Sequence, residues 1–158
     1  MINEYYKNLP KKRMGVGALI LNEKNEILIV KPSYKDHWSI AGGVVDENES
    51  PKEACIREVK EEMGINLKEV RFLCVDYTSD VDEKGESLQF IFFGGKFDEK
   101  ETDKIKLDGK EISGHRFLKI DDALPLLSEK LRMRLPKCLD ALKNNTAIYL
   151  ENGKEFLR

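Results

Sequence analysis

The feature that constrains this chain most is a helix whose two ends are both marked, Pro51–Met63. Ser50 can cap its first turn, Pro51 suits the first helical position, and Glu53 occupies the capping-box position. Gly64 stands where a left-handed C-terminal cap is usually found. A helix defined in this way packs one face on a core, and its apolar stripe consists of Ala54, Cys55, Val59 and Met63.

The same helix carries three glutamates, Glu58, Glu61 and Glu62, at the spacing i, i+3 and i+4. This spacing places the carboxylates on one face, where they repel one another, and near a helix end whose dipole disfavours negative charge. A solvated acidic face is the simple interpretation, but a cluster that breaks a stability rule beside Gly42 and Gly43 indicates a functional site. A hard divalent cation such as Mg²⁺ would relieve the repulsion. The pattern therefore predicts a carboxylate metal site and names no substrate.

Strand and helix patterns around this segment predict a mixed β-sheet covered by helices, that is, an α/β (α+β) fold. The expected strands are Met14–Leu21, Glu26–Lys31, Val70–Thr78, Leu88–Phe97 and His115–Ile120. A short helix is expected to start at Asp121 and Asp122, and an amphipathic helix is expected over Glu129–Lys143.

Turn residues define how these elements connect. The polar segment Asn22–Asn25 predicts a hairpin between the first two strands, and the Gly94-Gly95 pair predicts a bulge or a close approach in a later one. Asn152-Gly153 predicts the tight turn of a small C-terminal hairpin over 148–157. Since no repeat, linker or low-complexity tract interrupts the chain, we expect one domain over 1–158 with its core at about 12–143.

Composition argues against several classes of protein. The formal net charge of −2 provides no broad basic field for nucleic acid, and no apolar run approaches the roughly 20 residues of a membrane span. Cys55, Cys74 and Cys138 are odd in number and lack CxxC spacing, so we expect buried thiols rather than disulfides or metal ligands. With no apolar leader at the start, these features favour a cytoplasmic protein.

Around the marked helix the sequence resembles the Nudix box at every defined position. Gly43 is followed after five residues by Glu49, and after seven more by the run REVKEEMGI of Arg57–Ile65. The resemblance extends over about Lys12 to Lys143 and implies a Nudix-type α/β/α sandwich that cleaves diphosphate bonds by metal-assisted attack of water. One departure is Ala41, where many relatives carry proline before the glycine pair.

The resemblance also implies a metal and its ligands. Glu58, Glu61 and Glu62 are the expected ligands for Mg²⁺, with Mn²⁺ as the alternative, and the backbone carbonyl of Gly42 is a further expected ligand. Mg²⁺ prefers oxygen ligands and shares its coordination with substrate phosphates, so this set of groups suits a diphosphate substrate.

Other box residues are expected to hold the site together. Arg57 and Glu49 should form an ion pair, in which Arg57 orients Glu58 and Glu49 stabilises the turn from loop to helix. Gly43, Glu49 and Gly64 are therefore read as structural residues of the motif. Arg57 is also grouped with the catalytic residues through its action on Glu58.

One carboxylate must accept the proton of the attacking water. The resemblance implies either a box glutamate, Glu58 or Glu61, or a glutamate from a later loop. The best later residue is Glu111, just before the strand expected at 115–120, where MutT-type members carry such a group; the alternative for Glu111 is an exposed loop charge. Glu83 and Glu86 are weaker choices.

Substrate contacts are less well marked. Lys31 and Tyr34 lie just before the box and could contact phosphates, although surface lysines are common. Trp38 could stack on a base or pack beside the loop. A basic stretch in the late helix reads as a solvated face or as the rim of an anionic pocket, and it consists of Lys130, Arg132, Arg134 and Lys137.

The leading hypothesis is an Mg²⁺-dependent Nudix hydrolase acting on a nucleoside diphosphate linked to another moiety, most simply a nucleoside triphosphate or a related oxidised nucleotide. The alternative is a noncatalytic Nudix module that senses a nucleotide or binds a protein. An isopentenyl-diphosphate isomerase-like enzyme shares the fold, but Cys55 and Cys138 lack the matching context. The expected partner is a nucleotide-type small molecule, with no nucleic acid or membrane, and a homodimer is compatible with the family.

Overall fold

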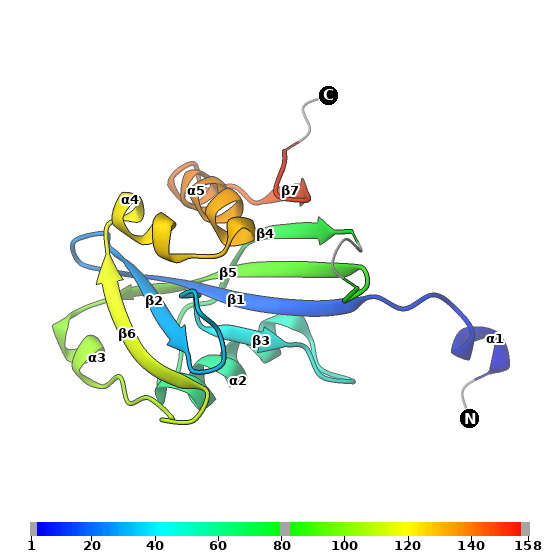
Figure 1. Ribbon diagram of the computed structural model, residues 1–158, viewed down its shortest axis with the longest axis horizontal. Coiled ribbons are helices and arrows are strands. Elements are labelled where there is room, and N and C mark those ends of the chain that lie inside the picture. Colours follow the sequence, from blue (N-terminus) through cyan, green and yellow to red (C-terminus); the bar gives the residue numbers. More distant parts are fainter. Residues whose placement is uncertain (1–2, 80–82, 156–158) are drawn as a thin grey trace.

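The computed structural model describes residues 3–79 and 83–155 and shows a seven-stranded mixed sheet between layers of helices (Figure 1). The strands are β1 (Arg13–Asn22), β2 (Ile27–Pro32), β3 (Gly42–Val44), β4 (Arg71–Thr78), β5 (Ser87–Phe97), β6 (Ile112–Leu118) and β7 (Ile148–Glu151). The helices are α1 (Glu4–Lys7), α2 (Pro51–Met63), α3 (Glu99–Asp103), α4 (Ile120–Ala123), the 3₁₀ turn η1 (Leu124–Leu126) and α5 (Glu129–Lys143). The predicted mixed α/β architecture is confirmed.

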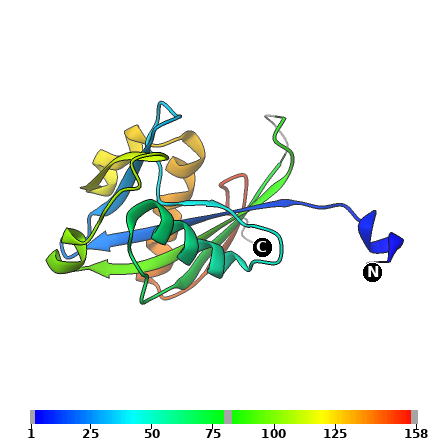
Figure 2. The ribbon, with the colours of Figure 1, turned by 90° about the horizontal axis from the view of Figure 1, so that it is seen from below.

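The strand order is β6-β2-β1-β5-β4-β7, and β3 adds to β1 outside this path. The central pair β1 and β5 is parallel, whereas β1 pairs antiparallel with both β2 and β3. α2 covers one face of the sheet (Figure 2), while α4, η1 and α5 cover the other. Both faces of the central strands are therefore buried, which explains the nearly continuous apolar run in β1.

Alternate side chains of β1 serve the two layers. Ala18 and Ile20 belong to the core on the α2 side, and Leu19 and Leu21 belong to the core on the α5 side. These four side chains are each at most 6% exposed. The alternation places one strand between two hydrophobic cores and fixes its register, because a slip of one residue would exchange the two sets.

The helix α2 has the predicted ends. Ser50 Oγ accepts a hydrogen bond from Glu53 N at 3.1 Å, and the Glu53 carboxylate accepts one from Ser50 N at 2.9 Å. Gly64 adopts φ +70°, the left-handed conformation that ends the helix. The predicted apolar stripe is fully buried, with Ala54, Cys55, Val59 and Met63 all at 0% exposure. Burial of this stripe fixes the rotation of α2 about its own axis, and with it the side of the helix on which the glutamates lie.

The predicted bulge is confirmed at Gly94. The register between β1 and β5 shifts between Leu19 and Ile20, so that Phe93 and Gly95 face them and Gly94 is left over. A Cβ on Gly94 would lie 2.8 Å from Ile20 Cγ1, which shows that the glycine makes room for a buried isoleucine.

Several boundaries differ from the sequence-based prediction. β3 was not predicted, since it has three residues and depends on pairing with β1. β6 begins at Ile112 rather than His115, because its antiparallel pairing with β2 reaches Pro32. It ends at Leu118, and Ile120 belongs to α4. The short helices α1 and α3 were also not predicted, as both are too short for helical periodicity to show.

The C-terminal segment is only partly the predicted hairpin. Asn152 and Gly153 both have positive φ, and a bridge joins Glu151 to Lys154, so the tight turn is present. β7, however, finds its main partner in β4, with which it pairs in parallel from Cys74 to Tyr77. Residues 156–158 lie outside the described residues, as do residues 80–82 of the predicted loop before β5.

Two expectations from composition can be compared with the structure. Cys55, Cys74 and Cys138 are free and buried, as predicted for structural thiols. In the parts of the chain that the structure describes, no helix has both the length and the apolar character needed to cross a bilayer.

Candidate active site

Two glycines bring β3 against both β1 and α2. A Cβ on Gly42 would run into the backbone oxygen of Val16, and a Cβ on Gly43 would run into the Glu58 carboxylate. Gly42 N also faces Glu62 Oε2 at 3.4 Å, a long contact at the limit of a hydrogen bond. The absence of both side chains therefore allows the glutamate face of α2 to lie directly under the β3 backbone.

Arg57 connects the loop before α2 to the glutamates. Its guanidinium donates to Glu49 from Nε at 2.7 Å and from Nη2 at 3.0 Å, which makes the contact bidentate. Nη1 donates to Glu58 at 3.0 Å and to Glu61 at 3.2 Å, while Nη2 also reaches the carbonyl of Val44 at 3.1 Å. The predicted Arg57–Glu49 ion pair is confirmed, and Arg57 lowers the pKa of Glu49.

The three glutamates differ sharply in environment. The Glu61 side chain is 58% exposed, whereas that of Glu58 is 12% exposed and Glu62 as a residue is 5% exposed. Burial, followed by the charge of Glu58, raises the pKa of Glu62 from its ordinary 4.5 to about 8. Burial also raises the pKa of Glu58, against the opposing effect of Arg57. Two carboxylates are thus held where they are difficult to ionise.

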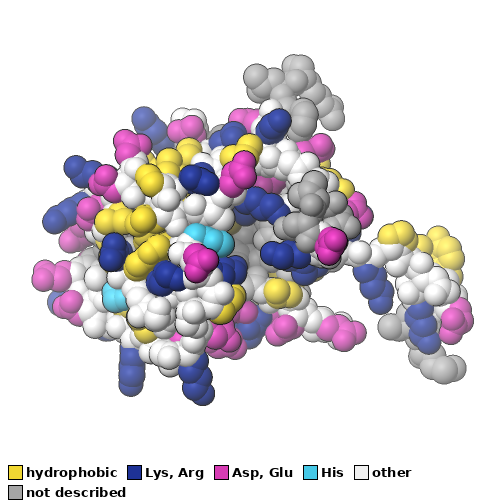
Figure 3. All heavy atoms as spheres, viewed as in Figure 1, with side chains coloured by type: hydrophobic (Ala, Val, Ile, Leu, Met, Phe, Trp, Pro, Cys, Tyr) yellow, Lys and Arg dark blue, Asp and Glu magenta, His cyan; other side chains and the backbone are white. Residues whose placement is uncertain are grey.

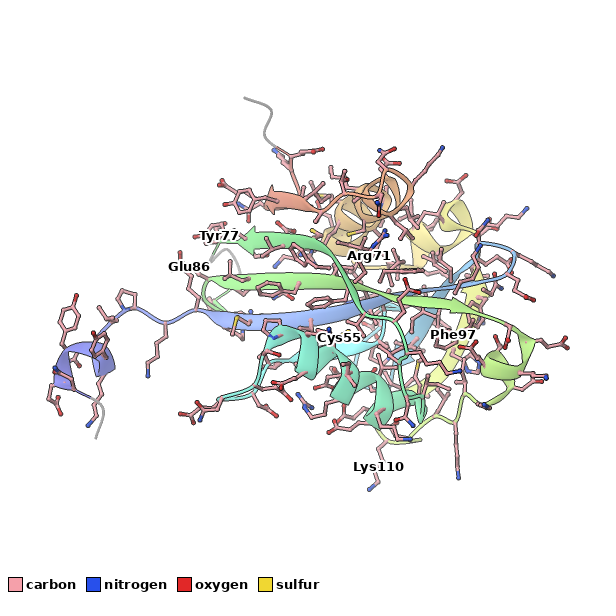
Figure 4. The ribbon with its side chains drawn as sticks, turned by 180° about the vertical axis from the view of Figure 1, so that it is seen from behind. Cys55, Arg71, Tyr77, Glu86, Phe97 and Lys110 are labelled. Atoms are coloured by element: carbon pink, nitrogen blue, oxygen red, sulfur yellow. The ribbon has the colours of Figure 1, made fainter. Side chains whose placement is uncertain are left out.

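A later loop closes over this carboxylate face. Lys106 N donates to Met63 O at 2.9 Å and Asp108 N donates to Glu62 O at 3.1 Å, so residues 106–108 run beside the end of α2. In Figure 4, Lys110 lies at the tip of this loop. The next residue, Glu111, acts electrostatically on Glu58 and Glu62 and raises the pKa of both. The loop that carries Glu111 therefore lies close enough to the end of α2 for the Glu111 charge to act on Glu58 and Glu62.

Asp108 and Ser33 shape this loop, and sequence reasoning did not single them out. Asp108 Oδ1 accepts from the backbone N–H groups of residues 110, 111 and 112 at 3.0, 3.2 and 3.1 Å. Ser33 N donates to Glu111 O at 2.8 Å, and Ser33 Oγ donates to Lys110 O at 2.6 Å. The Asp-Gly dipeptide at 108–109 was the available signal, since aspartate before a turn commonly binds its own backbone.

The weaker glutamate choices lie elsewhere. Glu86 accepts from Lys12 Nζ at 2.8 Å and from the Tyr77 hydroxyl. Figure 4 places Glu86 and Tyr77 at the far end of β4 and β5, away from Lys110. Glu83 is exposed in the same connection.

The predicted substrate contacts have different surroundings. Tyr34 is 71% exposed, and its pKa is raised by burial first and then by the charges of Glu111, Glu62 and Glu58. Lys31 Nζ donates to the carbonyls of Pro32 and Lys35, so it holds the turn after β2.

Trp38 packs against the core on the α5 side, as the structural alternative predicted. The Arg116 guanidinium lies over its ring at 4.8 Å, and Trp38 N donates to Leu126 O at 2.8 Å. The indole therefore contacts both the core and the Arg116 guanidinium, while the hydrogen bond to Leu126 comes from the Trp38 backbone.

The donor set suits a divalent cation, although it is not gathered as it stands. Within residues 3–79 and 83–155, no three His, Cys, Asp or Glu side chains form a group able to enclose a metal ion. Arg57 Nη1 instead lies between Glu58 and Glu61. Glu62, however, is a buried carboxylate with no Lys or Arg in ion-pair contact among the described residues, and carboxylate oxygens are what Mg²⁺ prefers. If the exposed Glu61 side chain rotated away from Arg57, its carboxylate would become available as a ligand beside Glu62.

Comparison with known proteins decides the family. A family model described as NUDIX domain matches residues 11–142, which is most of the chain. The chain belongs to the Nudix family. The Nudix hydrolases generally use divalent metal ions, in agreement with the donor set described above.

Individual relatives are similar in sequence and in structure. RNA pyrophosphohydrolase of Hydrogenovibrio crunogenus (strain DSM 25203 / XCL-2) is 41% identical over 61 residues, which are 39% of this chain and 37% of that protein. Diphosphoinositol polyphosphate phosphohydrolase 3-alpha of Mus musculus is 30% identical over 118 residues, 74% of this chain and 69% of that protein. A crystal structure of a MutT protein from Methanosarcina mazei Go1 has a TM-score of 0.68 at 25% identity and covers 87% of this chain and 99% of that one. The chain thus spans little more than a third of the first relative.

Gly43→Ala tests the close approach of this Nudix chain's β3 to α2. The added methyl group would overlap the Glu58 carboxylate, so we expect kcat/KM to fall about a hundredfold, the cost of misplacing a catalytic group by about 1 Å. Gly114→Ala is the matched control, because a Cβ there would meet its nearest atom at 3.7 Å, an ordinary contact. Steady-state kinetics on both variants measures the difference, and equal loss in the two would contradict the assigned role of Gly43.

Proposed function

We propose that this protein is an Mg²⁺-dependent pyrophosphohydrolase that cleaves a diphosphate bond in a nucleoside diphosphate linked to another group. The observation that carries the proposal is the buried carboxylate face of α2. Glu58 and Glu62 are held beside the β3 glycines with raised pKa values, and the charge of Glu111 acts on them from a separate loop. Burial and mutual repulsion disfavour the charged forms of these carboxylates, and a bound cation with a polyphosphate ligand explains why they are held together.

Four groups would hold the cation: the carboxylates of Glu58, Glu61 and Glu62, and the backbone carbonyl of Gly42. When bound, a divalent cation neutralises diphosphate charge and lowers the pKa of the attacking water. We prefer Mg²⁺ to Mn²⁺ because the donors are all oxygen and the substrate is a phosphate, the combination typical of Mg²⁺ sites.

The remaining chemistry belongs to the side chains. Arg57 orients Glu58 by a hydrogen bond at 3.0 Å while Glu49 fixes the other edge of its guanidinium. Glu111 is the proposed base, since its charge acts on Glu58 and Glu62 although it is not part of α2. We propose that the Tyr34 hydroxyl, whose pKa is raised in part by the charges of these carboxylates, donates a hydrogen bond to a phosphate.

Substrate class follows from the family and its named relatives. The two relatives above are named for hydrolysis of RNA pyrophosphate and of diphosphoinositol polyphosphate, so both names specify a phosphorus anhydride. We propose a nucleoside triphosphate or a related, oxidised nucleotide as the substrate of this chain. The free, buried cysteines are consistent with a cytoplasmic location, and light scattering would show whether the protein is a homodimer.

A product-resolved screen tests the activity. Purified protein with Mg²⁺ or Mn²⁺ is offered canonical and oxidised nucleoside triphosphates, dinucleoside polyphosphates and nucleotide sugars, and the phosphate and pyrophosphate released are measured. Turnover of at least one group is expected. Release from none of them, with nucleotide binding by thermal shift that Glu61→Gln leaves unchanged, would instead support a noncatalytic nucleotide-sensing Nudix module.

Metal-free protein should become less stable as the pH rises. Glu62 holds its proton up to about pH 8 when folded but only to about 4.5 when unfolded, so its contribution is complete below pH 4.5 and is lost as the pH rises to about 8. Thermal denaturation in EDTA between pH 5 and 8.5 measures this fall. Glu62→Gln should flatten it, and added Mg²⁺ should raise Tm more at pH 8 than at pH 5.5. A pH-independent difference between the variant and the original protein would contradict the assignment.

A further inference from the structure

The first residues that the structure describes form an arm that stands apart from the sheet and its helices (Figure 1). This N-terminal arm, residues 3–12, consists of α1 and an extended connection to β1, and every residue in it is exposed. Among the described residues, the hydrogen bonds of residues 3–9 stay within that segment. The first hydrogen bond from the arm to the body comes from Lys12, whose Nζ donates to Glu86 at 2.8 Å.

The arm carries apolar side chains that its own chain leaves uncovered. Tyr5 is 66% exposed, Tyr6 61% and Leu9 41%, and Figure 3 shows hydrophobic side chains gathered at the outer end of the arm. A helix of one turn is not stable in water on its own, because too few hydrogen bonds form to offset the free energy of nucleation. α1 has four residues and none of them is buried, so it requires a surface to pack against.

A second uncovered apolar surface lies on the sheet, on the same side as α2. α2 packs on β1, β3 and β5, and in Figure 4 the strands β4 and β7 continue past it without a helix on this face. Phe72 of β4 is paired with Phe92 of β5. Val75 of β4 is paired with Phe90 of β5 on one side and with Tyr149 of β7 on the other. Paired residues point to the same face, and Phe90 and Phe92 pack in the core on the α2 side, so this whole group lies on that face.

The outer part of this group is open to solvent. Phe72 is 40% exposed and Tyr149 is 53% exposed. The centroid of the Phe72 ring lies 6.3 Å from that of Phe90 and 6.0 Å from that of Phe92, distances at which aromatic rings attract one another. Phe72, Val75, Phe90 and Tyr149 thus form one apolar surface, the aromatic face.

Charge complementarity links the two surfaces. The arm carries three lysines and one glutamate, namely Lys7, Lys11, Lys12 and Glu4. At the border of the aromatic face, the Tyr149 hydroxyl donates to Glu151 at 2.7 Å, and this carboxylate has no Lys or Arg in ion-pair contact among the described residues. An arm bound to the aromatic face would bring a lysine to Glu151.

We propose that the N-terminal arm of one copy binds the aromatic face of a second copy, so that two chains exchange arms in a symmetric dimer. Tyr5, Tyr6 and Leu9 cover the aromatic face, and the lysines of the arm lie near Glu151. Under a twofold axis the two arm–face contacts are identical, and exchange of an identical element is a known route from monomer to dimer. The α2 carboxylates take no part in this contact.

The course of the connection favours a second copy over the arm's own aromatic face. Pro10 fixes its own φ angle and disfavours a helical conformation at Leu9, so the segment after Leu9 runs extended. The ion pair between Lys12 and Glu86 holds the end of this segment against the body. Figures 2 and 4 show the arm continuing the line of β1 away from the sheet, so that binding to its own face would require a reversal of the chain between Leu9 and Lys12.

The area available is sufficient for a stable dimer. An aromatic side chain buries about 150–250 Å². Applied to the exposed fractions of Tyr5, Tyr6, Phe72 and Tyr149, this range gives roughly 330–550 Å² for one arm–face contact. Two symmetric contacts give about 660–1,100 Å² before Leu9 and the backbone are counted, and specific interfaces start at about 1,000 Å².

The mass of the full chain in solution tests the proposal. Gel filtration with light scattering, across micromolar concentrations, is expected to give twice the mass of the chain. The double variant Tyr5→Ser with Tyr6→Ser should raise the dimer dissociation constant by about a hundredfold or more, because the symmetric dimer loses four aromatic side chains from its interface. Tyr34→Ser is the matched control, since Tyr34 is a tyrosine of similar exposure, 71%, outside both surfaces, and it should leave the dimer unchanged.

A mixing experiment tests the exchange itself. Tyr149→Lys damages the aromatic face and keeps the arm, whereas the double variant damages the arm and keeps the face. A mixed dimer of these two chains has one fully intact contact, so mixing should restore a dimer that neither variant forms alone. If Tyr149→Lys does not fold, the double variant still decides the matter, because its two side chains lie in the exposed arm.

Three results would overturn the proposal. A monomer at every concentration, with a Tm that falls in the double variant, would place the arm on its own aromatic face. A monomer with the same Tm in the double variant would leave the arm to a different class of partner. A dimer that persists in the double variant, or that mixing does not restore, would place the interface elsewhere on the chain.

Discussion

Glu62→Gln is expected to reduce kcat by about a thousandfold while making the metal-free protein more stable. The loss of activity follows because a metal ligand is removed, and bound metal contributes several kcal/mol of charge stabilisation to the transition state. The gain in stability follows because Glu62 is 5% exposed and its pKa is raised to about 8 by burial and by Glu58. An amide of the same shape removes the charge and can still accept from Gly42 N.

The measurement is kcat with Mg²⁺ beside thermal denaturation in EDTA at pH 8. We expect Tm to rise by roughly 3–10 °C, on the scale of about 2–4 °C per kcal/mol for a chain of this size. Glu61→Gln is the matched comparison, because the Glu61 side chain is 58% exposed. It should lose activity without the gain in Tm. Near-normal turnover of Glu62→Gln would remove Glu62 from the metal site.

Arg57→Ala should damage stability and activity together. Its guanidinium hydrogen-bonds Glu49, Glu58 and Glu61 as well as the carbonyl of Val44, so one substitution frees three carboxylates that then repel one another. Charge-assisted hydrogen bonds are the stronger ones, and loss of several should lower Tm by roughly 5 °C or more. We expect kcat/KM to fall about a hundredfold because Glu58 is no longer oriented.

The response to metal distinguishes the two effects of Arg57. Among the described residues, Glu49, Glu58 and Glu61 have no ion-pair partner besides Arg57. Without the arginine, a divalent cation would relieve their repulsion, so Mg²⁺ should raise Tm more in the variant than in the original protein. Lys60→Ala is the control on the same helix, since Lys60 Nζ makes one long contact, at 3.4 Å, to Gly64 O. A similar loss in Lys60→Ala would show that the cause is the net charge of α2 rather than the Arg57 contacts.

The helix α2 shows what sequence alone can predict. Its capping box, its glycine stop and its glutamate face all depend on residues within one turn or two of each other, and each was predicted at the residue where it occurs. The same holds for the bulge at Gly94 and for α5, which spans Glu129–Lys143 as expected. Short-range signals of this kind do not depend on the rest of the fold.

The surroundings of α2 could not be predicted in this way. β3 exists because Gly42 and Gly43 pass close to β1 and α2, and β7 lies beside β4, more than 70 residues earlier in the chain, instead of forming only its local hairpin. Glu111 was named from the family resemblance, but its distance from the box glutamates depended on how a loop folds over the end of α2. Asp108 and Ser33, which hold that loop, went unnoticed.

The sequence by itself determined one helix with a row of three glutamates, the strands on either side of it and the Nudix family. The tertiary structure decided which glutamates are buried and that the loop of Glu111 lies beside the end of α2. It also decided that Arg134 is buried, which makes the prediction of a solvated basic face wrong for this residue, and that it pairs with Asp76, 58 residues earlier in the chain. The physical reason is the separation along the chain over which each effect acts. Caps, turns and periodicity act between neighbours in the chain, whereas burial, pKa and the pairing of buried charges depend on residues that only the folded chain brings together.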